Sequence, residues 1–193
     1  MRADARKNRE HLLAVAGDVI TEQGVDASMR DIARRADVGL ATLLRHFPTR
    51  EALLEALLRT NFDQLAATAA DLETSPSPDD ALVRWLRDFV ASARDYRGVI
   101  ASMVTAIADE ESALHESCVA MRAAGTRLLA RAQAEGGARK DIDGTDLFAL
   151  AGSLAWLGDQ PSLAPRADHL FDVVVSAVLP LAGHATAGRK DRP

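Results

Sequence analysis

The sequence predicts an all-α protein with an N-terminal three-helix helix-turn-helix domain and a C-terminal helical bundle. Apolar residues recur about every 3.6 positions in almost every window, and the valines and isoleucines form no alternating runs. With 193 residues, of which 48% are hydrophobic, the chain is long enough for a small head and one larger core. We therefore expect a head over residues 1–50, a bundle over residues 51–185 and a disordered tail over residues 186–193.

The segment of residues 8–27 is expected to contain the first helix. Leu13, Ala16 and Ile20 fall on one face of this segment, which is typical of a helix that packs on a core. Gly24 marks the point where the helix must stop, because glycine takes the left-handed conformation of a helix end without a steric cost.

Residues 28–47 predict two short helices joined by a tight turn. Ser28 is expected to cap the first of them, with Asp31 as a shorter substitute for the glutamate of a capping box. The segment Asp37-Val38-Gly39 interrupts the helical spacing and predicts the turn. The apolar positions of the two helices are Met29, Ile32, Ala33 and Ala36 in the first and Leu40, Leu43 and Phe47 in the second.

The second short helix, residues 40–47, has the size and polarity of a helix that enters DNA. A helix of about ten residues is roughly 15 Å long and fits a major groove that is about 12 Å wide. We expect Thr42 and Arg45 to face the bases, together with the backbone near Gly39 and Leu40, since Gly39 has no Cβ and permits a close approach.

Three further residues are expected to hold phosphates: Ser28, His46 and Arg50. Pro48 ends the short helix and Thr49 can cap the next one, so the cation of Arg50 lies beside exposed backbone N–H groups. For His46 the alternative is a half-buried helix end.

These residues resemble the DNA-binding head of the TetR (tetracycline-repressor) family of bacterial transcription regulators. The resemblance covers residues 8–59. Three positions depart from the family pattern: Asp37 stands where the family often has Gly, Gly39 where it often has a small hydroxyl residue, and Leu44 where it usually has a Tyr that touches the DNA backbone. The matching positions are Ile32-Ala33, Val38, Thr42-Leu43, His46-Phe47 and the run Pro48-Thr49-Arg50-Glu51-Ala52-Leu53.

Charge is unevenly divided along the chain. The formal net charge is -5, yet residues 1–60 carry ten basic and nine acidic side chains, so the acidity belongs to the bundle. A head this close to neutrality predicts a DNA interface with a few placed cations in a dimer rather than a broad basic field. The basic residues before the first helix form either a minor-groove arm or a disordered terminus: Arg2, Arg6, Lys7 and Arg9.

Turn residues divide the rest of the chain into helices. Thr74 to Pro78 predict a loop, Gly98 a break, Gly136-Gly137 a helix stop, and Pro161 with Pro165 the last connection. The expected helices are 52–72, 78–96, 99–109, 112–136, 145–160 and 166–183.

The last two helices have apolar residues on more of their surface than one core contact requires. The resemblance implies a homodimer that pairs through roughly residues 144–159 and 165–182, and the alternative is a crowded core within one monomer. In the last helix the apolar residues are Leu170, Phe171, Val173, Val174, Val175, Ala177, Val178 and Leu181.

The resemblance also implies a small-molecule effector of unknown identity, whose binding in the bundle moves the heads and releases DNA. Bulky and adaptable side chains on several predicted helices can line such a pocket, although residues of this kind at helical spacing more commonly form a core. The candidate residues are Trp85, Phe89, Met103, Met121, Phe148 and Trp156.

Nothing in the sequence favours catalysis, a cofactor or a metal. The chain lacks a nucleophile elbow, a phosphate-binding Gly-rich loop and a Cys-x-x-Cys pair. Glu111, His115 and Cys118 lack a fourth ligand and the spacing of a metal site. The single cysteine and the absence of a signal peptide or an apolar run of membrane-spanning length predict a cytoplasmic protein.

Two functions therefore remain open. In the first, a homodimeric repressor binds a palindromic double-stranded operator and is released by a small ligand. In the second, the same head is joined to a bundle that acts as a protein-interaction or DNA-architectural module without a ligand.

Overall fold

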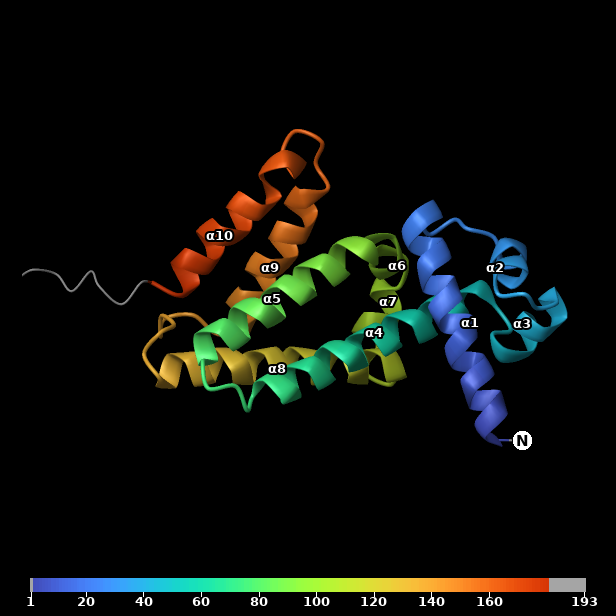
Figure 1. Cartoon of the computed structure of the whole chain (residues 1–193), viewed down its shortest axis with the longest axis horizontal. Coiled ribbons are helices and arrows are strands. Elements are labelled where there is room, and N and C mark those ends of the chain that lie inside the picture. Colours follow the sequence, from blue (N-terminus) through green and yellow to red (C-terminus); the bar gives the residue numbers. More distant parts are fainter. Residues whose placement is uncertain (1, 181–193) are drawn as a thin grey trace, which may run out of the picture. The chain divides into compact units, whose positions relative to one another are not determined.

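The computed structural model describes residues 2–180, and every regular element among them is a helix, which confirms the all-α prediction. The predicted disordered tail, residues 186–193, lies outside the described residues. The elements are α1 (Arg2–Gln23), α2 (Met29–Arg35), α3 (Leu40–His46), α4 (Arg50–Leu72), α5 (Pro78–Asp95), α6 (Arg97–Ser102), α7 (Val104–Ala108), α8 (Ala113–Ala134), α9 (Gly144–Gly158), a 3₁₀ turn η1 (Ala164–Arg166) and α10 (Ala167–Val178) (Figure 1).

The contacts divide the chain into two compact units. One unit runs up to residue 67 and includes residues 91–121, while the other combines residues 68–90 with the chain from residue 122 onward. Residues 91–121 belong to the first unit because they pack against residues that are far from them in the sequence. A Cβ placed on Gly17 would lie 3.1 Å from the Tyr96 hydroxyl oxygen, and Ser92 Oγ donates to Asn61 Oδ1 at 2.7 Å.

Helix α1 begins earlier than predicted. It starts at Arg2 instead of residue 8, so Arg6, Lys7 and Arg9 belong to the helix and not to an arm or a disordered terminus that precedes it. Within the added turns, Arg6 pairs with Glu10 one turn later at 3.5 Å. The Arg9 guanidinium carbon lies 5.1 Å from the centroid of the Phe47 ring, within the range of a cation–π contact.

The single helix predicted over residues 99–109 is wrong, because the structure has two short helices with a break at Met103. Gly98, predicted to separate two helices, lies inside α6. Its Cβ would lie 3.1 Å from Val25 Cβ, so the glycine allows a close approach to the connection between α1 and α2. The sequence pattern alone does not distinguish a packing glycine from a helix stop.

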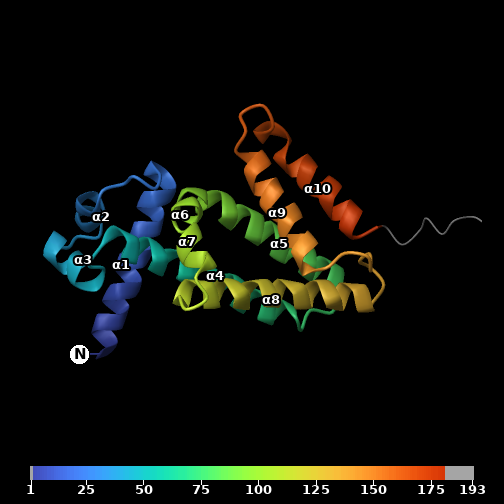
Figure 2. The ribbon, with the colours of Figure 1, turned by 180° about the vertical axis from the view of Figure 1, so that it is seen from behind.

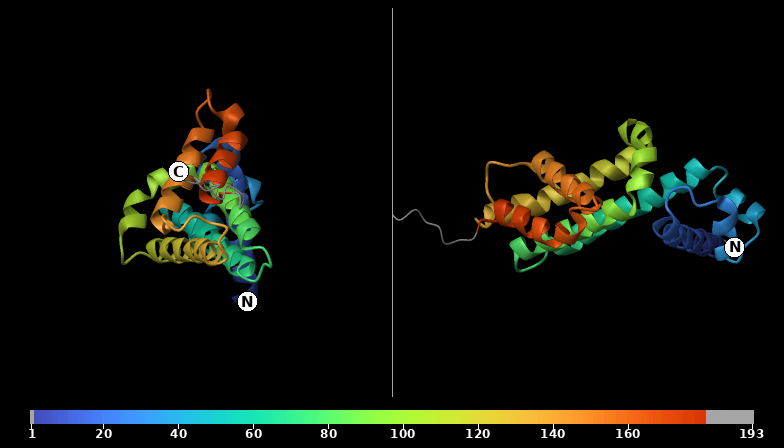
Figure 3. Two further views of the ribbon diagram at one scale, coloured as in Figure 1. Left: turned by 90° about the vertical axis from the view of Figure 1, so that its left-hand side faces the viewer. Right: turned by 90° about the horizontal axis from the view of Figure 1, so that it is seen from above.

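In the second unit, α9 and α10 lie side by side and are connected by η1 (Figures 1 and 2). The two views in Figure 3 show the same pair in orange and red. Asp143 begins α9 with a full capping box, accepting from the backbone N–H groups of Thr145 and Asp146 while the Asp146 side chain accepts from the Asp143 N–H. The helix pair predicted from the two prolines is therefore present.

Candidate nucleic-acid interface

The start of α2 is capped as predicted. Ser28 Oγ accepts a hydrogen bond from the Asp31 N–H at 3.0 Å and donates one to Asp31 Oδ2 at 2.6 Å. Asp31 thus bonds the cap hydroxyl instead of the cap backbone, because its side chain is one methylene shorter than the glutamate of a capping box. The Ser28 hydroxyl, predicted to hold a phosphate, already has two partners within its own turn.

The turn between α2 and α3 depends on an unusual backbone conformation at Asp37. This residue has φ 54°, in the left-handed region that favours glycine. The Val38 N–H bonds the Ala33 carbonyl at 3.0 Å and the Asp37 N–H bonds the Arg34 carbonyl at 3.2 Å, which closes the end of α2. Asp37 stands where the TetR family often has Gly, and its positive φ is a conformation that glycine adopts without strain.

Substitutions at Asp37 should show this requirement in the stability of the protein. We expect Asp37→Ala to have a free energy of unfolding about 1 kcal/mol lower than Asp37→Gly, because alanine is strained at positive φ. Urea unfolding monitored by circular dichroism measures the difference. The same pair at Asp63, exposed within α4, should show the opposite order, since alanine is the better residue inside a helix. Equal stabilities of the two Asp37 variants would contradict the argument.

Helix α3 is held by two core side chains and presents its other side to solvent. Leu43 and Phe47 are buried, whereas Ala41, Leu44 and Arg45 are exposed. Gly39 is the N-cap, and a Cβ placed on it would meet no atom within 4 Å, so the space in front of the helix is open. Of the predicted base-contacting residues, Arg45 is exposed, while Thr42 and Leu40 are half-buried on the same short helix.

His46 and Arg50 both have partners within the head. The Asn8 side-chain amide nitrogen lies 3.2 Å from His46 Nε2, and the imidazole is half-buried, which favours the alternative of a helix end. Arg50 Nη1 donates to the Ala27 carbonyl, and Arg50 Nη2 is a buried atom without a hydrogen-bond partner. Arg50 therefore connects the first turn of α4 to the residue before the Ser28 cap, a role that differs from the predicted phosphate contact.

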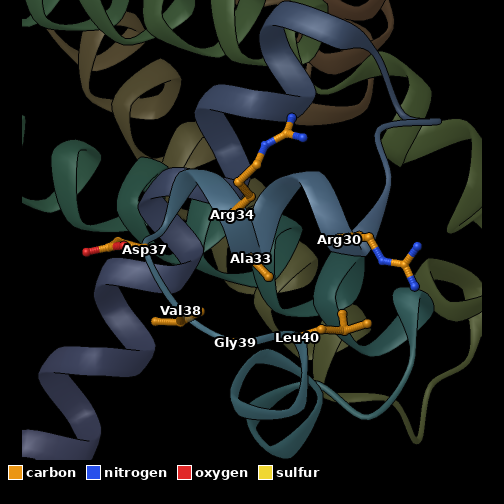
Figure 4. A pocket seen from close by; sticks show the side chains of 7 residues that line it. All are labelled: Arg30, Ala33, Arg34, Asp37, Val38, Gly39 and Leu40. Carbon is orange, nitrogen blue, oxygen red and sulfur yellow. The ribbon is translucent and has the colours of Figure 1, made fainter.

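An open hollow of about 480 Å³ lies between α2 and the start of α3. Figure 4 shows Arg30 and Arg34 extending from α2, with Val38, Gly39 and Leu40 along the other side. Arg30 and Arg34 were not among the predicted site residues. Their spacing of four positions on the polar face of α2 was the available signal, but the sequence did not show that this face borders the start of α3.

Salt bridges reduce the free positive charge of the head. Arg35 makes a two-pronged contact with Glu22, in which Nη2 donates to Oε1 at 2.6 Å, and this hydrogen bonding lowers the pKa of Glu22 and raises the pKa of Arg35. Arg34 Nη2 lies 2.8 Å from Asp31 Oδ1. These pairs agree with an interface that depends on a few cations.

Three of the six candidate ligand residues form an aromatic cluster in the second unit. Trp85 stacks on Phe89 with ring centroids 5.6 Å apart, and Phe148 meets Trp85 edge-on at 5.8 Å and Phe89 at 5.3 Å. The Arg122 guanidinium carbon lies 5.2 Å from the Phe148 centroid. Trp85 is fully buried, whereas Phe89 and Phe148 are half-buried.

The other three candidates do not join this cluster. Trp156 is 62% exposed, and Met103 and Met121 are buried in the first unit. A crevice in the second unit has a volume of about 10 Å³, far below the roughly 300 Å³ or more of a small-molecule pocket. It is lined by Leu86, Val90, Leu147, Leu150, Ala151, Leu154, Phe171, Val174 and Val175.

Residues 2–180 contain no group of three or more His, Cys, Asp and Glu side chains placed to hold a metal ion. His115 Nδ1 lies 2.8 Å from the Ile107 carbonyl oxygen, so one of its ring nitrogens already has a backbone partner.

Within residues 2–180, every helix is too short or too polar to cross a membrane.

Comparisons with known proteins agree with this geometry. The family profile described as "Bacterial regulatory proteins, tetR family" matches residues 12–57, and the profile described as "Transcriptional regulator SbtR-like, C-terminal domain" matches residues 77–178, which is more than half of the chain. The chain belongs to the TetR family. It is a DNA-binding transcriptional regulator with an N-terminal helix-turn-helix domain and a C-terminal helical bundle.

Solved TetR structures resemble this regulator over most of its length. A TetR transcriptional regulator from Streptomyces coelicolor is 35% identical with a TM-score of 0.74, covering 90% of this chain and 99% of its own. A TetR regulatory protein from Mycobacterium vanbaalenii is 32% identical with a TM-score of 0.71, covering 92% and 98%. An HTH-type transcriptional regulator from Staphylococcus aureus is 36% identical over 74 residues, and this match spans 37% of the chain but only 38% of that relative.

Proposed function

We propose that this TetR-family regulator is a homodimeric, cytoplasmic repressor that binds a palindromic operator through α3 and releases it when a small ligand occupies the bundle. The observation that carries the DNA contact is the exposed side of α3, where Arg45 faces solvent while Leu43 and Phe47 lie in the core. One helix of seven residues reaches too few bases for useful specificity. Two copies reading half-sites about 34–36 Å apart supply the rest.

Apolar side chains on α9 and α10 support the dimer. Trp156 is 62% exposed on α9 and Val173 is 50% exposed on α10. Leu150 is also exposed, and a Cβ placed on Gly152 would meet no atom within 4 Å, so the outward side of α9 is open. Large apolar side chains exposed on two adjacent helices are typical of a subunit interface.

A charge in this surface should separate the subunits. We expect Trp156→Glu to convert the dimer into a monomer, because pairing would bury an unpartnered carboxylate. Light scattering at micromolar concentration measures the mass. Val119→Glu is the matched control, since Val119 is 51% exposed in the other unit and its variant should remain a dimer. A wild-type monomer, or a Trp156→Glu dimer, would contradict the proposed interface.

Selection of bound duplexes from a random pool tests the DNA function directly. The proposal expects enrichment of a palindrome and an affinity that falls with salt, with a logarithmic slope near −7 if about eight phosphates are contacted per dimer. Failure to enrich any sequence, together with a slope near zero, would refute it.

The ligand part rests on the match to the TetR C-terminal domain and on the aromatic cluster of the bundle. Since Trp85 is fully buried, a ligand must displace or open this cluster. A thermal-shift screen of small apolar compounds tests this step, because a ligand at 100 times its Kd adds about 2.7 kcal/mol of stability. A hit must also weaken operator binding. A bundle that responds only to a protein partner would instead indicate the interaction module.

A further inference from the structure

Some apolar side chains of α3 lie on its outward side and do not pack in the core of the head. Leu44 is 38% exposed, although the neighbouring Leu43 is fully buried. Leu40 and Ala41 precede Leu44 by four and three positions and thus lie on the same side of the helix. Leu40 is half-buried and Ala41 is exposed. These three residues form an apolar stripe on the helix that is proposed to enter DNA.

Arginine side chains lie near this stripe. Arg45 is exposed beside Leu44, and Arg30 and Arg34 border the hollow that Leu40 lines (Figure 4). The guanidinium groups of Arg30 and Arg45 can bind phosphates and base acceptors, whereas Arg34 is paired with Asp31 and the apolar side chain of Leu44 cannot bind a phosphate. Its partner in a DNA complex must be apolar if its burial is to stabilise the complex.

We propose that Leu44, with Ala41 beside it, packs against the 5-methyl group of a thymine in the major groove, so that each operator half-site contains a thymine at that position. The thymine methyl is the apolar group that base edges present in this groove. The small Ala41 side chain leaves room next to Leu44 for the methyl group, and the open space at Gly39 allows the start of α3 to come close to the bases. This inference rests on the proposed operator binding.

Replacing thymine by deoxyuridine tests the contact, because it removes the methyl group and leaves base pairing unchanged. In the selected operator, each thymine is replaced in turn in one half-site and then in both, and affinity is measured by fluorescence anisotropy. At one position the wild-type protein should bind about fourfold more weakly, the loss expected for one buried methyl group. Replacement in both half-sites should weaken binding roughly 15-fold if the two contributions add.

The Leu44→Ala variant assigns the effect to this side chain. Its affinity for the thymine operator should be reduced, and it should no longer distinguish thymine from deoxyuridine at that position. Leu44 is partly exposed, so the variant should fold, as circular dichroism can verify. The control Val119→Ala shortens an exposed valine outside α3 and should keep the full deoxyuridine penalty.

The outcomes separate this inference from the proposed function. A protein that binds the selected operator equally well with deoxyuridine at every position would overturn the thymine contact alone. The thymine contact would also be overturned if Leu44→Ala bound more weakly but still lost affinity when thymine was replaced by deoxyuridine. That result would indicate that Leu44 packs on a sugar. A protein that enriches no duplex would overturn the proposed function and this inference together.

Discussion

Arg45→Ala should weaken operator binding by at least about 30-fold while the protein remains a folded dimer. Arg45 is exposed on α3, and the adjacent core residues Leu43 and Phe47 do not depend on it. An arginine that pairs with guanine through two hydrogen bonds contributes about 1–3 kcal/mol of discrimination. A dimer loses this contribution in both half-sites, so the smallest expected loss of binding free energy is about 2 kcal/mol. This loss corresponds to an affinity about 30-fold weaker.

Two further variants make the Arg45 experiment specific. Arg45→Lys keeps the charge but loses the planar fork of donors, so it should restore non-specific binding without restoring preference for the operator. Arg84→Ala removes an exposed arginine from α5 and should leave affinity unchanged. Normal operator affinity in Arg45→Ala, measured by anisotropy at fixed salt, would show that another surface meets the DNA.

Trp85→Ala should have the largest effect on the stability of the bundle. The Trp85 ring is fully buried between Phe89 and Phe148, and its removal leaves a cavity in a packed aromatic cluster. Truncation of such a residue costs about 3–5 kcal/mol of the free energy of unfolding. Urea unfolding should therefore show a midpoint well below that of the wild-type protein.

Gly125 provides an independent test of the same packing. A Cβ at this position would lie 2.4 Å from Trp85 Cη2 and 3.0 Å from Phe148 Cζ, so Gly125→Ala must displace these rings and should lower the free energy of unfolding. Trp156→Ala is the control, since Trp156 is mostly exposed within the monomer. If Trp85→Ala and Trp156→Ala were equally stable, measured under monomeric conditions, the cluster would not be the core of the bundle.

Local signals in the sequence predicted most helix ends correctly. Ser28 and Thr49 cap the helices that follow them, with Oγ accepting from a backbone N–H three residues later at 3.0 and 3.1 Å. Gly24 and Gly136 end α1 and α8 with φ of 86° and 85°. These features depend on residues within one turn of each other, so their chemistry can be read from the order of the chain.

The contacts that the sequence did not predict join residues that are far apart along the chain. Gly98 resembles a helix stop in the sequence, but it lies inside α6 and close to Val25. Arg50, expected from the sequence to hold a phosphate, also donates from its guanidinium group to the Ala27 carbonyl, a contact that the sequence did not predict. Neither partner is close in sequence, and hydrophobic spacing carries no information about which segments meet.

The order of residues along the chain was enough to predict the helical class, the caps and stops, and the short helix that carries Arg45. It did not predict that Arg30 and Arg34 border the same hollow as Leu40, or that Trp85 is buried while Trp156 is exposed. The difference lies in the range of the interactions. Hydrogen bonds within a turn and helical periodicity are set by neighbours along the chain, whereas burial is set by whichever segments the folded chain brings together.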